Sequence, residues 1–155
     1  MKKTFIFLFF LLCSSAAIVA QNLREFSVVN FKEKPFDRSA TDERYKIVDG
    51  NGDLFSIIKL VAATPGDDLR AYVFDFGLPE SRVKSVDGDV WAYVQRNAMR
   101  ATIKREGFNT VKYELPVTVQ PGQVFEMTLQ ATPRVAKKRI LLLEVSPADS
   151  KAQIT

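Results

Sequence analysis

Apolar and polar side chains alternate with a period of two over most of this chain, in short runs separated by turn residues. The clearest runs are Val111–Leu115 and Phe125–Gln130, in which every second side chain is apolar. Turns recur roughly every 8–12 residues, and Asp87-Gly88 is the strongest hairpin signal because this pair tolerates the positive φ angles of a tight reversal. The pattern predicts an all-β chain folded as an antiparallel β-sandwich, in which each sheet buries one face.

Eight such runs are the expected strands, and a polar connection over residues 32–44 follows the first of them. We see no amphipathic helix in this part of the chain. The expected strands are 26–31, 54–61, 70–76, 82–86, 89–95, 101–104, 111–115 and 125–130. Side chains on the apolar sides of these runs predict a core that includes Ile57, Ile103, Tyr113, Phe125 and Met127.

The segment Met1–Ala20 is typical of a secretory signal peptide, with two early lysines, the apolar run Phe5–Leu12 and small residues before the end. A membrane-spanning helix needs about 20 predominantly apolar residues. In this segment Cys13-Ser14-Ser15 interrupts the apolar stretch before that length is reached. We therefore expect cleavage before Gln21 and export to the periplasm, cell envelope or extracellular space, with no stable membrane span after processing. Lipid attachment at Cys13 and an uncleaved anchor are the alternatives.

Composition narrows the chemistry of the exported part. The sequence has no histidine, and its one cysteine lies in the leader, so export leaves no histidine base, thiolate nucleophile, His/Cys zinc site or disulfide. The whole chain carries 22 Lys and Arg against 18 Asp and Glu, and two of those lysines also lie in the leader. This balance does not indicate a nucleic-acid partner. We expect a protein that is not an enzyme and needs no cofactor.

The part of the chain from about residue 90 to about residue 131 resembles the PEGA domain. That family combines a strand, a Pro-Glu-Gly-Ala turn, a strand ending in a glycine-aromatic pair, and a strand after Pro-Gly. Gln95-Arg96-Asn97 takes the place of Pro-Glu-Gly, and Asn97 suits that turn because asparagine tolerates the left-handed conformation. The residues that match the family pattern are Ala98, Gly107, Phe108, Pro121 and Gly122.

The resemblance implies a small β-sandwich akin to carboxypeptidase regulatory modules, found in exported and surface proteins and without catalysis. Together with the leader, the resemblance divides the chain into a signal peptide (1–20), a PEGA-like sandwich (21–133) and a tail (134–155). Within the tail, Leu142–Thr155 is similar to the opening of a second such unit, so we interpret the tail as a linker with an incomplete second repeat.

Two acidic motifs suggest sites. Asp49–Asp53 has the spacing that opens a calcium-binding loop, but the sixth and twelfth positions of that loop are leucines, which favours a plain turn and no metal. The best carboxylate pairs for acid-base catalysis are Asp67 with Asp68 and Asp87 with Asp89. Acidic residues this close together in turns are more often solvated turn formers.

Two expected strands are apolar on both sides, although a sandwich strand in an isolated domain needs only one apolar side. Their aromatic residues are Tyr72, Phe74, Trp91 and Tyr93. These side chains are either the core or an exposed aromatic strip that would bind sugar rings or another domain.

Three classes of function agree with the sequence. The first is a non-catalytic, exported cell-envelope module that contacts other envelope proteins. The second is a carbohydrate-binding module that binds a cell-surface glycan through the aromatic strip. The third is a surface subunit assembled through a β edge, in which a terminal strand such as Ile140–Val145 completes the sheet of a neighbour.

Overall fold

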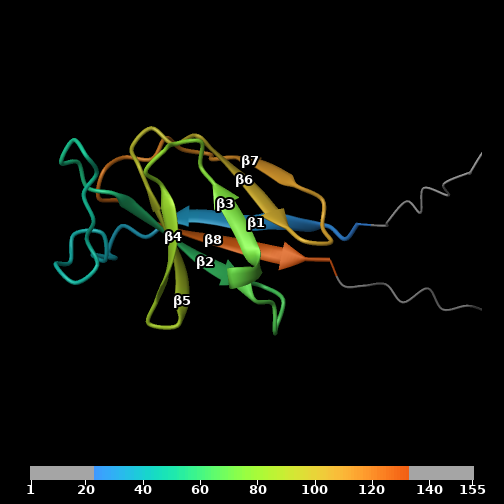
Figure 1. Cartoon of the computed structure of the whole chain (residues 1–155). Coiled ribbons are helices and arrows are strands. Elements are labelled where there is room, and N and C mark those ends of the chain that lie inside the picture. The colour runs from blue at the N-terminus through green and yellow to red at the C-terminus, as the bar shows by residue number, and fades with distance from the viewer. Residues whose placement is uncertain (1–22, 133–155) are drawn as a thin grey trace, which may run out of the picture.

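The computed structural model describes residues 23–132, which form two β-sheets packed face to face (Figure 1). The larger sheet has the order β1-β8-β2-β5-β4 and the smaller one the order β3-β6-β7. The predicted all-β sandwich is thus confirmed, while the signal segment 1–20 and the tail 134–155 lie outside the described residues. The strands are β1 (Phe26–Glu33), β2 (Ser56–Ala62), β3 (Tyr72–Asp75), β4 (Arg82–Val86), β5 (Asp89–Val94), β6 (Arg100–Arg105), β7 (Val111–Glu114) and β8 (Val124–Ala131).

The predicted turns have the expected backbone geometry. The hairpin between β4 and β5 reverses at Asp87 and Gly88, whose φ angles are 50° and 93°. Asn97, in the turn between β5 and β6, has a φ of 66°. Both non-glycine residues therefore occupy the left-handed region that asparagine and aspartate tolerate best.

One pairing was not indicated by the alternation. The last strand, β8, lies between the first two and runs antiparallel to β1 but parallel to β2, with Ile58 opposite Phe125 and Leu60 opposite Met127. Alternation predicts which side chains share a face of a strand, and it carries no information about which strands become neighbours.

The core between the sheets contains most of the residues predicted for it. Ile103, Phe125 and Met127 are fully buried there, and Phe31 stacks on Phe125 with ring centroids 5.1 Å apart. Tyr113 is only half-buried at the margin of this core. Because interior side chains interdigitate closely, this core fixes how the two sheets face each other.

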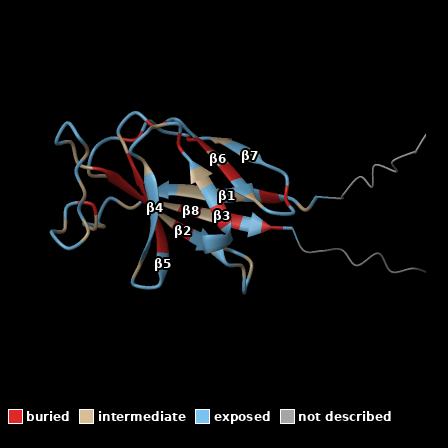
Figure 2. Cartoon of the chain, viewed as in Figure 1, coloured by how far each residue is buried: buried red, intermediate tan, exposed pale blue. Residues whose placement is uncertain are grey.

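A second apolar cluster covers the outer face of the larger sheet, where segment 34–54 crosses it. The prediction of one buried face per sheet is therefore wrong for this sheet, and Ile57 is buried on the outer side. Figure 2 shows the buried stretches of β2 and β5 in red. The buried members of this cluster are Ala40, Phe55, Ile57, Trp91, Tyr93 and Val124, with Tyr45, Ile47 and Val86 packed against them.

Candidate interaction surface

The structure separates the four aromatic residues that the sequence suggested as a strip. Trp91 and Tyr93 are 6% and 2% exposed and belong to the outer cluster. Tyr72 is 5% exposed and, with the half-buried Phe74, belongs to the core between the sheets. Of the two alternatives that the sequence left open, burial is the one the structure shows and the exposed aromatic strip is not, because segment 34–54 covers one pair and the opposing sheet covers the other.

Lys59 of β2 contacts segment 34–54 on the outer face of the larger sheet. Its ammonium forms an ion pair with Asp37 at 2.6 Å and donates a hydrogen bond to the Ser39 hydroxyl at 2.9 Å. It also lies 4.4 Å from the centroid of the Trp91 ring, within the range of a cation-π contact. Burial acts to raise the pKa of Asp37, but the hydrogen bonds from Lys59 and Ser39 outweigh it and hold that pKa below its ordinary value.

Tyr45 makes a second attachment of the same segment. Its ring meets Trp91 edge to face, with centroids 5.2 Å apart, and its hydroxyl donates to the carboxylate of Asp87 at 2.9 Å. This hydrogen bond raises the pKa of Tyr45. The segment is thereby joined to the β4–β5 hairpin as well as to β2, and Asp87 has a structural partner.

Three of the acidic residues considered as catalytic carboxylates lie around one depression of the surface. Asp67, Asp68 and Asp89 line an open depression of about 370 Å³ beside the ends of β2 and β5. The nearly buried carboxylate of Asp67 pairs with Arg105 and accepts a hydrogen bond from the Tyr72 hydroxyl at 2.7 Å. Asp68 accepts the backbone N–H of Arg70 at the start of a short 3-10 helix, Leu69–Ala71. Two of these three carboxylates therefore hold the local fold together.

The Asp49–Asp53 turn also uses its acidic groups internally. Asp49 accepts the backbone N–H groups of Asn51 and Asp53 at 2.9 and 3.0 Å, and Asp53 forms an ion pair with Arg96 at 3.2 Å. Over residues 23–132, no three His, Cys, Asp or Glu side chains come together in a way that could hold a metal ion. The turn has the geometry of an Asx turn.

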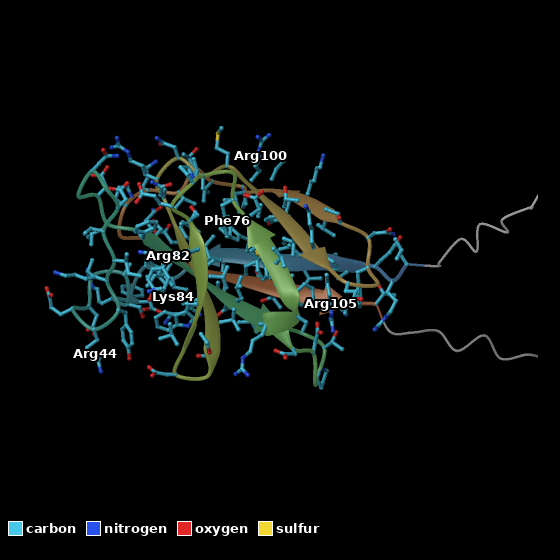
Figure 3. The ribbon with its side chains drawn as sticks, in the orientation of Figure 1. Arg44, Phe76, Arg82, Lys84, Arg100 and Arg105 are labelled. Carbon is cyan, nitrogen blue, oxygen red and sulfur yellow. The ribbon has the colours of Figure 1, made fainter. Side chains whose placement is uncertain are left out.

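Among residues 23–132, strand β4 forms an exposed margin of the larger sheet, with β5 as its one strand neighbour. Residues 82–85 are all exposed, and Figure 2 shows β4 in pale blue. Arg82 and Lys84 project on the outer face, where they lie over the rings of Phe55 and Tyr93 at 5.5 and 5.7 Å from the centroids. Figure 3 shows both cations along this strand. Sequence alternation did not distinguish β4 from the other strands.

The start of β1 and the end of β8 lie side by side, so the chain enters and leaves the sandwich at the same end. Phe26 of β1 is opposite Ala131 of β8, and Thr132 donates its N–H to the carbonyl of Glu25 at 2.8 Å. The guanidinium of Arg24 donates to the carbonyl of Thr132 at 3.1 Å. Segment 34–54 lies at the opposite end of the molecule (Figure 1).

Sequence reasoning missed the outer cluster because the connection before β2 is rich in charged residues. The signal that could have revealed it is the set of apolar residues within and after that connection, Ala40, Tyr45, Ile47 and Phe55, together with the two-sided apolar strand β5. No helix among the described residues has the length and apolar character needed to cross a membrane. Comparison with protein-family models, with curated proteins and with solved structures finds no match for this chain.

Proposed function

We propose that this chain is a non-catalytic, exported module of the cell envelope that binds another envelope protein through its surface. The observation that carries this proposal is the pairing of the first and last described strands at Phe26 and Ala131, which places the entry and the exit of the sandwich at the same end. A sandwich attached at one end presents its far end and its sheet margins to a partner. The far end includes Phe36, which is 93% exposed, and a partner that covered this ring would remove apolar surface from water.

The turn geometry supports a relation to PEGA-type modules. Three residues at the turns of the matching region, Asn97, Gly107 and Gly122, have φ angles of 66°, 75° and 75°. These are the positions at which the family pattern places glycine or its substitute. A module of that type would present or space other parts of an envelope protein and would carry out no chemistry.

The burial of the aromatic rings favours a protein partner over a glycan. Sugar recognition by a flat platform requires ring faces open to solvent. Trp91 and Tyr93 instead pack against Tyr45, Ile47 and Ala40 of the chain's own segment. Binding of a sugar at these rings would require that segment to leave the sheet.

The test uses the purified full chain and an envelope fraction of the producing cells. The untreated envelope fraction should retain the chain. A fraction digested with protease should no longer retain it, whereas a fraction whose glycans have been oxidised with periodate still should. Retention that survives protease but not periodate would contradict a protein partner and favour the carbohydrate-binding function. A Trp91→Ala variant, checked for folding, then shows whether the covered ring takes part.

Export is tested separately by intact mass of the protein recovered outside the cytoplasm. The expected mass corresponds to a chain that begins at Gln21. A chain that begins at Cys13 with added lipid mass would show a lipoprotein instead. A protein retained in the cytoplasm at full length would contradict the envelope location.

A further inference from the structure

We propose that the free edge of β4 accepts an extended acidic segment of the partner protein, which adds to the larger sheet as a sixth strand. This inference rests on the proposed function, because it names the surface and the chemistry of the partner. It follows from the hydrogen-bonding pattern of β4, from its charges and from a comparison with the other sheet margins.

The hairpin geometry shows which backbone groups of β4 are free. The two-residue turn places Val86 opposite Asp89, and the residues that flank such a turn form a hydrogen-bonded pair. Bonded and non-bonded pairs then alternate, so Arg82 and Lys84 use their backbone groups toward β5. Val83 and Ser85 therefore direct their N–H and C=O groups away from the sheet, where an added strand would meet them.

The side chains of β4 determine which strand fits. Arg82 and Lys84 project on the same face, and none of the ion pairs formed among residues 23–132 involves either of them. Two acidic residues lie near the ends of the strand, and each already accepts a hydrogen bond. Asp87 accepts one from the Tyr45 hydroxyl, and Glu80 accepts one from the backbone N–H of Gly50. An added strand with carboxylates at alternate positions would bring them beside the two cations.

The other sheet margins are less suited to strand addition. β1 is interrupted by a bulge between Val28 and Asn30, which bends an edge and breaks its ladder. β3 and β7 are only four residues long each, and β7 carries charges of both signs. β4 offers five residues in unbroken register with charges of one sign.

A second copy of this chain is a poor occupant of the same edge. Two β4 strands paired antiparallel about Lys84 would place their cations side by side, and like charges directly opposite each other destabilise a sheet. The basic edge therefore disfavours self-association while favouring an acidic strand.

The experiment measures binding of a labelled ten-residue peptide of alternating glutamate and threonine to the full chain, with a lysine-threonine peptide as its counterpart. The acidic peptide should bind and the basic one should not. On binding, the backbone amides of Val83 and Ser85 should become protected from hydrogen exchange, while those of Arg82 and Lys84 should change little. Added salt should weaken binding, since the contacts are exposed.

Variants separate the backbone contribution from the charges. Ser85→Pro removes an outward N–H, a change that edge strands tolerate, and should abolish binding, whereas Ser85→Ala should bind as the unchanged chain does. Replacing both Arg82 and Lys84 by Gln should weaken binding about tenfold. Arg100→Gln combined with Lys112→Gln removes the same charge from the smaller sheet and should have no effect. Thermal unfolding checks that every variant is folded.

Three results would overturn the inference: no binding of the acidic peptide, equal binding of both peptides, or binding without protection of Val83 and Ser85. A concentration-dependent dimer lost in the folded Ser85→Pro variant would assign the edge to a second copy instead. If the peptide fails to bind but protease-sensitive retention on the envelope persists, the edge inference fails and the proposed function stands. If the peptide binds without such retention, the proposed function fails alone.

Discussion

The ammonium of Lys59 lies 4.4 Å from the centroid of the Trp91 ring while it forms an ion pair with Asp37 at 2.6 Å. One side chain of β2 thus contacts both the sheet and the segment that covers it. Lys59 and Asp37 retain 26% and 21% exposed side chains, so solvent screens their attraction only in part. This contact closes the outer face over Trp91.

Replacing Lys59 by methionine should loosen segment 34–54 and lower the free energy of unfolding by about 1–3 kcal/mol, because a cation-π contact and a charged hydrogen bond are lost. Chemical denaturation measures the loss, and hydrogen exchange should accelerate first in the segment. The matched control is Lys46→Met, which breaks the solvent-exposed pair of Lys46 with Glu43 and should have little effect. Equal effects of the two variants would contradict a special role of Lys59.

Acid should weaken the attachment through Asp37. The pKa of this carboxyl is lower in the folded protein than in the unfolded chain, so its contribution to stability is present above its unfolded pKa of about 4 and is lost as the pH falls through its folded pKa. We expect stability to decline below about pH 4, with a smaller decline in Asp37→Asn. Denaturation midpoints measured from pH 6 to pH 2 test this, and parallel profiles for the two proteins would refute it.

Phe125→Ala should lower the free energy of unfolding by about 3–5 kcal/mol, because it opens a cavity in the core between the sheets. Phe125 is fully buried and stacked on Phe31. Phe36→Ala is the matched control, since that ring is 93% exposed and its loss should change stability little. A negligible shift in the denaturation midpoint of Phe125→Ala would mean that the register of β8 is wrong by one residue.

Asn97 should tolerate glycine better than alanine. Its φ of 66° costs about 1–2 kcal/mol for a residue with an ordinary side chain and nothing for glycine. We expect Asn97→Ala to lose about 1 kcal/mol and Asn97→Gly to stay within about 0.5 kcal/mol of the unchanged chain. Both variants keep the backbone hydrogen bond from residue 97 to Val119, so thermal denaturation isolates the turn conformation. The opposite order would place this turn outside the left-handed region.

Much of the fold follows from local patterns. The β4–β5 hairpin was predictable because Asp87-Gly88 fits the backbone angles of a tight reversal, and the burial of Ile103, Phe125 and Met127 was predictable from the apolar sides of their runs. These features depend on neighbouring residues in the sequence, which alternation and turn chemistry describe directly.

The candidate surface could not be predicted in the same way. Trp91 and Tyr93 sit on a strand with two apolar sides, and both a covered core and an open platform agree with that pattern. Their burial depends on Ala40, Tyr45 and Ile47, which come from a segment far away in the sequence. Long-range packing of this kind decides whether an apolar face is covered or free.

By itself, the sequence determined the strand positions, the turn types and which side chains share a face, because these depend on backbone sterics and on local periodicity. Only the tertiary structure decided that β8 inserts between β1 and β2, that segment 34–54 covers the outer face and that β4 forms a basic margin of the larger sheet within residues 23–132. Neighbouring strands are chosen by the burial and hydrogen bonding of the whole chain at once, and that choice has no signature within any single strand.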